Sequence, residues 1–474
     1  MRWIAALLLG LFSTLAFAQN EDWVHADFRR EAERVGDACT FHSFMSVGSC
    51  GYTLFTDHPL HIAAGSMPPQ NGFGLGLAYV ANRNTENWRL SWDLDAVGAT
   101  SGAAWRAGGY LKLIHVPVQP IHITTSATSA PGEQPAKPKK HTVSVHPFTV
   151  FNLYAQAISL DKLNYFGLGN DTSLLDASVF GMTQTIVGAN VIKPVFEFPS
   201  LSRLNLSLFG EMNGRFVSIR PEHGQSIPSI ETLYTNATAP GLSSQPGFLQ
   251  FGEGVRIKPV LGDHLELNYA GSFQEFVAPS NSQNTFERWI VDLNHTFYLY
   301  GYTESGPTST TMTGPDECSP TGQSCPKVSR SRNLNGSIGV RFLLSESMNS
   351  ASKVPFYFQP TLGGQDINSN LTLPSYQDYR YRGANLLLLE EKFEHSVWGP
   401  FGVKFLMDQG RVAVDRGDLG FSHLRHSYAA GLTLRAGGFP MVQMMFAWGG
   451  SEGHHNIFNL NSSLLGGGSR PPLD

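Results

Sequence analysis

The chain has 474 residues, of which 15% are charged and 11% aromatic, and it contains 49 glycines with a formal net charge of -5. This composition is typical of a β-rich protein rather than a helical enzyme, and the length allows several soluble domains or one large barrel. The weakly acidic charge gives no support for nucleic-acid binding, so we expect no nucleic acid among the partners.

The first eighteen residues have the pattern of a secretory signal peptide. Arg2 supplies the positive charge, residues 3–15 are mostly apolar, and residues 16–18 read Ala-Phe-Ala, a small-residue cleavage site. This apolar run is shorter than a membrane-spanning helix, and no later segment offers about 18 uninterrupted apolar residues. We therefore expect residues 1–18 to direct export and no membrane helix to follow.

Residues 19–70 are expected to form a short periplasmic leader or plug. Within them, residues 21–35 have the pattern of a short amphipathic helix. Cys39 and Cys50 follow this helix, and a disulfide between them would clip the leader together.

Cys318 and Cys325 form a second local pair, in a segment rich in Pro, Thr and Gly. Because export leads to an oxidising compartment, we expect two local disulfides, Cys39–Cys50 and Cys318–Cys325. Neither pair has C-x-x-C spacing, and no histidine pair combines helical spacing with a carboxylate, so we predict no metal and no cofactor. No serine has histidine and acid partners in a recognisable arrangement, so we predict no catalytic residue and no enzyme activity.

From residue 71 onward, segments of about ten residues alternate between apolar and polar side chains. The clearest segment is residues 88–95, in which alternate side chains point to opposite faces of a strand. The apolar face carries Trp88, Leu90, Trp92 and Leu94, and the polar face carries Arg89, Ser91, Asp93 and Asp95. A soluble sandwich alternates too, but tryptophans near strand ends favour a membrane barrel. About 16 such segments predict an all-β fold: a transmembrane antiparallel β-barrel over residues 71–465, followed by a C-terminal tail at 466–474.

The connections of such a barrel should alternate between short periplasmic turns and longer outer loops. The outer set is expected to include residues 119–141 and 303–329. Two further long connections, 161–176 and 221–246, fall on the periplasmic side in this count. Either these turns are elaborated, or the count has missed or merged a strand.

The stretch 360–412 holds the most specific pattern. A short strand ends at Gly363 and Gly364, a polar loop rich in Asn, Ser, Asp and Tyr follows, and a hairpin then turns at residues 398–400. The returning strand closes with Met-Asp-Gln-Gly-Arg-Val at residues 407–412. By position in the strand count, the loop lies between the eleventh and twelfth strands; an ordinary hairpin is the alternative interpretation.

This layout resembles the bacterial surface antigen family, the BamA/TamA-type superfamily of outer-membrane assembly barrels. In that family a loop between strands eleven and twelve folds into the lumen, and the next strand carries aromatic-Asp-x-Gly-Arg-Val, which residues 407–412 match with Met in place of the aromatic. The family's Arg-Gly-Phe core would align with residues 373–376, where its arginine and glycine are missing. Residues 165–172, Tyr-Phe-Gly-Leu-Gly-Asn-Asp-Thr, resemble a second family segment.

The resemblance implies that residues 365–383 fold into the lumen, where Arg380 or Arg382 would lie near the inward carboxylate of Asp408. The residues expected to form the lumen loop and its anchor are Gly363, Gly364, Tyr376, Arg380, Arg382, Gly383, Asp408 and Arg411.

The resemblance also implies a place in the bacterial outer membrane and a role in inserting or translocating outer-membrane proteins. The expected partners are outer-membrane lipid and other outer-membrane proteins as clients. Residues 19–70 are too few for one of the periplasmic repeat modules that precede the barrel in the assembly proteins. A passive porin-like channel and a structural surface antigen are the alternatives, and a membrane-embedded hydrolase is a weaker one.

Overall fold

The computed structural model describes the chain in segments, and the signal-peptide prediction for residues 1–18 lies outside them. The described residues are 23–39, 50, 53–54, 60–85, 87–100, 102–115, 149–195, 204–222, 226–259, 261, 264–299, 303–307, 327–331, 336–436, 439–450, 452–460 and 470–473.

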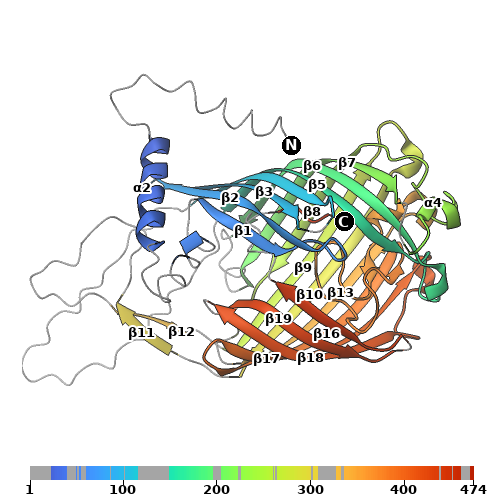
Figure 1. Ribbon diagram of the computed structural model, residues 1–474. Helices are drawn as coiled ribbons and strands as arrows, with labels where there is room; N and C mark the ends of the chain where they lie inside the picture. The colour runs from blue at the N-terminus through green and yellow to red at the C-terminus, as the bar shows by residue number, and fades with distance from the viewer. Residues whose placement is uncertain are drawn as a thin grey trace, which may run out of the picture.

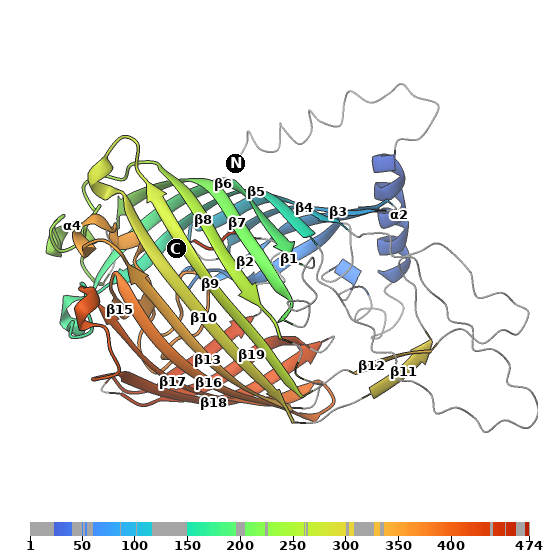
Figure 2. The same cartoon turned by 180° about the vertical axis from the view of Figure 1, so that it is seen from behind.

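One antiparallel sheet of 16 strands curls into a barrel, in which sequential strands are neighbours (Figures 1 and 2). In order around the sheet these strands are β1 (Leu60–Ser66), β2 (Phe73–Asn84), β3 (Trp88–Ala99), β4 (Trp105–His115), β5 (Thr149–Tyr165), β6 (Ser178–Pro194), β7 (Leu206–Pro221), β8 (Phe248–Ile257), β9 (Leu265–Val277), β10 (Phe286–Tyr298), β13 (Gly336–Ser347), β16 (Asn385–Trp398), β17 (Phe401–Ala413), β18 (Arg425–Ala436), β19 (Phe439–Trp448) and β20 (His455–Leu460). The predicted all-β barrel of about 16 strands is confirmed.

Smaller elements lie at both ends of the barrel. The helix α2 (Trp23–Ala38) and the hairpin of β11 (Thr303–Pro307) with β12 (Lys327–Ser331) are at one end, and the short helix α4 (Ile230–Leu233) is at the other (Figure 1). None of the helices in the described segments is long and apolar enough to cross a membrane.

The barrel is nearly closed. β1 and β20 approach each other, but among the described residues no hydrogen-bonded ladder joins these two strands. Every other neighbouring pair in the sheet is bonded, so the sheet has one seam, between its first and last strands.

The first strand lies before the predicted start of the barrel at residue 71. β1 reads Leu-His-Ile-Ala-Ala-Gly-Ser and pairs along its whole length with β2. Its side chains are mostly small, so it lacks the alternation between bulky apolar and polar residues that marks the other strands. The barrel therefore begins at Leu60, and the missed strand explains the conflict in the predicted connections.

When β1 is included in the strand count, each later connection is assigned to the opposite end of the barrel. The connections at 166–177 and, in its described parts, at 222 and 226–247 follow the fifth and seventh strands, so they lie at the same end as the loop that follows the eleventh strand. The hairpin of β11 and β12 follows the tenth strand and lies at the opposite end, with α2 (Figure 2). Residues 119–141 lie outside the described segments.

The structure contains the Cys39–Cys50 disulfide, with 4.5 Å between the two Cα atoms. Cys318 and Cys325 lie outside the described residues, and their disulfide stays a prediction. Non-reducing peptide mapping of freshly isolated membranes is expected to recover the two cysteines in one cross-linked peptide pair, because export exposes them to an oxidising compartment. Free thiols at both positions would contradict it.

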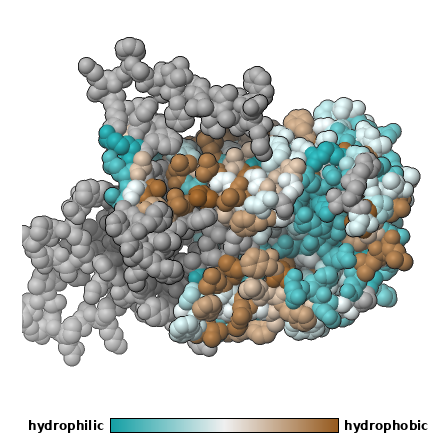
Figure 3. Space-filling model, in the orientation of Figure 1, coloured by the Kyte–Doolittle hydropathy of each residue, from teal (hydrophilic) through white to brown (hydrophobic). Residues whose placement is uncertain are grey.

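The two faces of the strands differ as the alternation predicts. On β3, Asp93 and Asp95 face the interior and are 7% and 5% exposed, whereas Leu94 between them is 55% exposed. Exposed apolar side chains of this kind form bands over the strands (Figure 3). An apolar outer face and a polar inner face are the inside-out pattern of a membrane barrel.

Leu94 offers a test of this assignment. Because Leu94 lies near the middle of β3 on the outer face, Leu94→Arg is expected to lower the free energy of unfolding in lipid by about 2–4 kcal/mol. Asp93→Asn, on the inner face, is the matched control and is expected to cost much less. Denaturant titration of both variants in lipid vesicles measures the difference, and equal losses would argue against a lipid-facing Leu94.

An apolar core fills part of the barrel interior. Phe276 stacks on Phe286 at 4.5 Å between ring centroids, and Phe358 from a loop inside the barrel packs on Phe248 and Phe276 at 5.1 and 5.3 Å. All these rings are buried together with Phe356. The interior at this level is therefore a packed core rather than a water-filled channel.

Candidate functional site

The candidate site is the long connection between β13 and β16, residues 348–384, which we call the lumen loop. It joins the eleventh and twelfth strands of the sheet, the position that the strand count predicts for it. Two short strands, β14 (Thr361–Leu362) and β15 (Tyr381–Arg382), pair to form its neck. Most of its residues are buried. The loop contacts β6 through Phe356 and β17 through Leu373, seven strands apart in the sheet, so it lies in the lumen.

Gly363 and Gly364 stand where the neck opens into the tip of the loop, a name we use for residues 364–379. Both have positive φ, +109° and +60°, which other residues adopt at a cost. A Cβ on Gly363 would lie 2.5 Å from the Cβ of Arg380, and one on Gly364 would lie 2.7 Å from the backbone of Asp378. The two sides of the neck approach so closely that only glycine, which has no side chain, fits at these two positions.

Three further residues of the tip hold positive φ although they are not glycine: Ser369, Leu373 and Tyr379, at +65°, +47° and +61°. Such backbone is strained and persists only where the surroundings impose it. The packing around the tip therefore holds it in one conformation.

Asp408 of β17 is fully buried and anchors the tip. Its Oδ2 accepts a hydrogen bond from the backbone N–H of Leu373 at 2.9 Å. The expected partner, Arg380 or Arg382, is not there: both guanidinium groups bond elsewhere. The tip thus binds the carboxylate through its backbone rather than through an arginine side chain.

Charged residues of the barrel wall follow one another across the strands beside Asp408. Cross-strand register places Glu390 opposite Asp408 and Arg341 opposite Glu390. Arg341 also forms two parallel hydrogen bonds to Asp292, each 3.0 Å long. This bidentate geometry is a strong form of charge pairing.

Arg380 ties the lumen loop to two other connections. Its Nε lies 2.6 Å from Oε1 of Glu452, in the turn between β19 and β20, and the two side chains are 3% and 7% exposed. Its remaining nitrogens donate to the Thr172 hydroxyl and carbonyl at 2.6 Å. The guanidinium also lies over the rings of Phe166 and Tyr381, at 5.0 and 4.6 Å.

Arg382 is bound within the lumen loop and to the segment after β5. Its guanidinium donates to the carbonyls of Phe356 and Gln359 at 2.7 and 3.2 Å, and its own carbonyl accepts from the N–H of Gly169 at 2.7 Å. Gly167 and Gly169 have φ of +94° and +99°, the backbone angles for which glycine is suited. The two segments that resemble the family, more than 200 residues apart, thus meet in the lumen.

Tyr376 and Gly383 lie in tight contacts. Tyr376 packs edge-on against Tyr381, with ring centroids 5.3 Å apart, and its hydroxyl leaves no room for a Cβ on Gly450 of the β19–β20 turn. A Cβ on Gly383 would lie 2.7 Å from the carbonyl oxygen of Ala413. Both positions therefore hold the loop against neighbouring strands.

Arg411 is not part of the lumen site. It lies an odd number of residues from Asp408 along β17, so its side chain is on the outer face. Its Nη1 donates to the carbonyl and hydroxyl of Ser422 at 3.0 and 3.3 Å. The expected inward role of Arg411 is wrong, because the alternation of the strand sends neighbouring odd and even positions to opposite sides.

A cavity of about 670 Å³ lies where the lumen loop meets the seam. Its lining includes Gln70 of the β1–β2 turn, Gln365 and Asp378 of the loop, and His455 at the start of β20. Burial raises the pKa of the Asp378 carboxyl above its usual range, and the Gln365 N–H, which donates to it at 2.9 Å, opposes this shift. Polar groups from the first strand, the last strand and the loop thus converge on one hollow.

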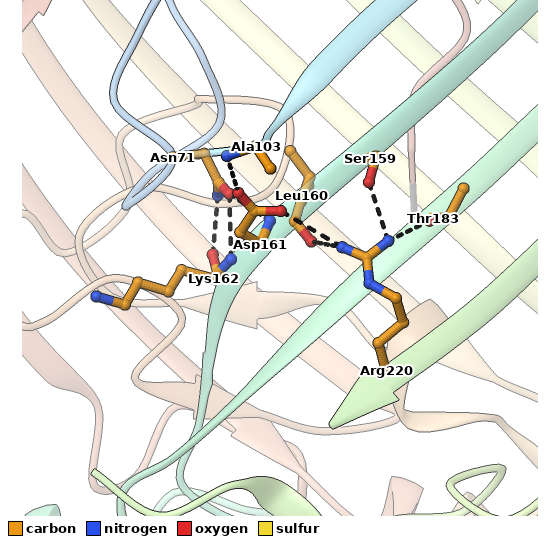
Figure 4. Close-up of polar contacts among 8 residues, drawn as sticks. All are labelled: Asn71, Ala103, Ser159, Leu160, Asp161, Lys162, Thr183 and Arg220. Carbon is orange, nitrogen blue, oxygen red and sulfur yellow. Dashed lines mark hydrogen bonds and ion pairs between the residues drawn. The ribbon is translucent and has the colours of Figure 1, made fainter. Parts of the chain in front are cut away.

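Hydrogen bonds fix the β1–β2 turn beside this cavity (Figure 4). β5 has an irregularity between Leu160 and Leu163 that leaves backbone groups without ladder partners. Asn71 accepts from the N–H groups of Asp161 and Lys162 at 2.8 and 3.1 Å and donates to the Lys162 carbonyl at 2.8 Å. Arg220 of β7 donates to the Leu160 carbonyl at 3.0 Å.

Sequence reasoning missed several partners in this site. Glu452 carries no local signal, since it stands alone in a glycine-rich turn. Ser427 accepts a hydrogen bond from the N–H of Ser375 at 2.8 Å, and Arg425 donates to Asn170 and Asp171 at 2.8 and 3.1 Å. Of these partners, only Asn170 and Asp171 lie in a segment that the sequence had singled out, residues 165–172, which resemble a family segment.

Comparison with known proteins gives structural similarities at low sequence identity. No family model matches the sequence, and no curated protein matches it. CdiB from Acinetobacter baumannii has a TM-score of 0.45 at 10% identity, over 84% of this chain and 59% of that chain. CdiB from Escherichia coli has a TM-score of 0.46 at 11% identity, over 85% and 63%.

BamA from Haemophilus ducreyi, in a structure lacking POTRA domains 1–3, has a TM-score of 0.43 at 11% identity, over 85% of this chain and 69% of that chain. The chain thus spans less than two thirds of the length of the two CdiB chains. The fold assignment rests on the strand pairing described above.

Proposed function

We propose that the protein is an outer-membrane barrel that inserts or translocates polypeptides, with the lumen loop as the part that must move. The observation that carries this proposal is the docking of the lumen loop. The tip is held at separate points on the wall by single hydrogen bonds, at Asp408 and Ser427, rather than by a continuous ladder. Contacts of this kind can be broken one by one without unfolding a strand.

The position of the loop beside the seam supports the same proposal. Arg380 and Tyr376 both contact the turn that leads into β20, the last strand. The seam is the one place in the described sheet where two neighbouring strands expose unpaired backbone groups to each other. Unpaired strand edges can bind an added strand, so a loop that moves the β19–β20 turn would change access to such an edge.

The packed interior argues against a passive porin-like channel. Porins have a polar, water-filled lumen. Here Phe356 and Phe358 of the lumen loop pack on buried phenylalanines of the wall, which leaves an apolar core in the path. A solute would have to displace this core.

Comparison of proteomes from the native host tests the function. We expect deletion of the gene to remove a defined set of proteins from the outer-membrane or the secreted fraction, and the wild-type gene to restore them. Loss from the membrane fraction indicates insertion, and loss from the medium indicates secretion. If neither fraction changes, the proposal is wrong; altered uptake of small solutes would then favour a channel, and unchanged uptake a structural role.

A cysteine pair tests whether the loop moves. Ser375 and Ser427 are both fully buried, and the Ser375 backbone N–H donates to the Ser427 hydroxyl at 2.8 Å. The two residues are therefore neighbours, and a cysteine pair at these positions is the cross-link to test. The variant Ser375→Cys with Ser427→Cys is expected to restore the missing proteins only when a reductant is added. The two single variants, and wild type with reductant, are the matched controls. Full restoration by the oxidised double variant would show that the tip can stay docked during function.

A further inference from the structure

A segment beyond the last strand lies inside the barrel. Residues 470–473 read Arg-Pro-Pro-Leu, and their contacts are with β3, β6 and the lumen loop, none of which neighbours β20 in the sheet. Leu473 is buried in the same apolar cluster as Phe356 and Phe358. We call residues 470–473 the tail segment.

Two side-chain amides bind the backbone of Leu473. Asn368 Oδ1, in the tip of the lumen loop, accepts the Leu473 N–H at 2.8 Å, and Gln184 Nε2 of β6 donates to the Leu473 carbonyl at 3.0 Å. Gln184 is itself 1% exposed. Amides that bind both backbone groups of one residue can hold an extended chain whatever its side chain, and the apolar cluster adds a preference for a hydrophobic residue.

A carboxylate binds the other end of the tail segment. Arg470 Nη2 lies 3.2 Å from Oδ2 of Asp95, a side chain fully shielded from solvent. Arg106 lies 3.3 Å from the same oxygen, and Asp93 is buried on the same face of β3. The wall thus offers an acidic contact three residues before the apolar one.

We propose that Asp95, Gln184, Asn368 and the surrounding apolar cluster form a peptide-binding site in the lumen, with the tail segment as its tethered occupant. An incoming extended polypeptide takes the site when the tail segment leaves it. The ligand class is a short extended peptide with a basic residue followed, three positions later, by an apolar one. This inference rests on the proposed function, since it identifies part of the path of a passing polypeptide.

The chemistry of the tail segment suits a tethered occupant. Its two prolines restrict the backbone to extended conformations, so little conformational entropy is lost on binding. A tether also gives the segment an effective concentration of about millimolar or higher at its site. A free peptide must therefore compete with it, and the site stays closed to weakly binding chains.

The binding of a synthetic peptide tests the proposal in purified full-length protein. The probe is a fluorescein-labelled peptide containing Gly-Ser-Arg-Pro-Pro-Leu, and the readout is fluorescence anisotropy in detergent. The variant Arg470→Glu with Leu473→Asp should release the tail segment and keep the rest of the chain. We expect this variant to bind the peptide at least about tenfold more tightly than wild type.

Two controls define the site. Adding Gln184→Leu to the released variant removes one backbone contact from the wall and should weaken binding of the probe. A second peptide, with its arginine changed to glutamate and its leucine to aspartate, should not bind. Heat-dependent mobility on gels verifies that each variant is folded, and deletion of residues 470–474 provides a second released variant if the first fails to fold.

Equal binding by wild type and the released variants, or no binding by any of them, would overturn the proposal. Such a result would leave the proteome comparison unaffected, because a barrel can insert or secrete polypeptides without this site. Conversely, peptide binding with unchanged proteomes would support the site and contradict the proposed function.

Discussion

Replacing residues 364–379 with a short glycine-serine turn is expected to turn a poorly conducting barrel into a good ion conductor. This segment is the tip of the lumen loop and carries the contacts to Asp408 and Ser427. A short turn can join the two strands of the neck after the tip is removed. β14 and β15 pair with each other and bring Gly363 beside Arg380. The same protein carries Phe356→Ser and Phe358→Ser, which take the two loop phenylalanines out of the apolar core that fills the path. Together these changes free lumen that water and ions can enter.

Single-channel recording in planar bilayers measures this effect on purified protein. We expect a several-fold higher conductance for the tip-deleted protein than for wild type. The matched control is a replacement at the same end of the barrel but outside the lumen: residues 416–421, in the connection between β17 and β18, changed to glycine and serine. Equal conductance of wild type and the tip-deleted protein would show that the tip does not block the lumen.

Arg380→Ala is expected to be among the most destabilising single substitutions in the lumen loop. The substitution leaves Glu452 buried without its partner at 2.6 Å and removes the bonds to Thr172. Breaking a buried ion pair by removing one partner costs about 3–5 kcal/mol in the free energy of unfolding. Denaturant titration in detergent, followed by tryptophan fluorescence, measures the loss.

Two controls separate this effect from a general loss of an arginine. Arg411→Ala removes an arginine whose contacts to Ser422 are exposed on the outer face, and it is expected to cost less than about 1 kcal/mol. The double variant Arg380→Leu with Glu452→Leu removes both charges and is expected to regain much of the loss. An Arg411→Ala cost equal to that of Arg380→Ala would contradict the buried-pair explanation.

The seam and the lumen loop have a common structural basis. The loop contacts the β19–β20 turn through Arg380 and Tyr376, and the cavity between them is lined by residues of the β1–β2 turn and β20. The two strands that flank the seam are also the shortest in the sheet. Movement of the loop would therefore act first on the least supported part of the barrel.

The sequence by itself determined the features that depend on local pattern. Side chains alternate along a strand, so the order of residues was enough to assign Asp93 to the inner face and Leu94 to the outer face. The same reasoning predicted about 16 strands and a lumen loop after the eleventh; the sheet has both, although the count left out β1. The glycines at 363 and 364 marked a sharp turn, because few other residues tolerate positive φ.

Only the tertiary structure decided which groups meet. Arg380 pairs with Glu452, and Asp408 binds a backbone N–H instead of an arginine, because closing the barrel brings together residues that no periodicity relates. β1 escaped detection because small side chains give no alternation, and the tail segment because a contact with Gln184 spans 289 residues. Local pattern follows from backbone geometry, whereas pairing inside a lumen depends on how the whole sheet closes.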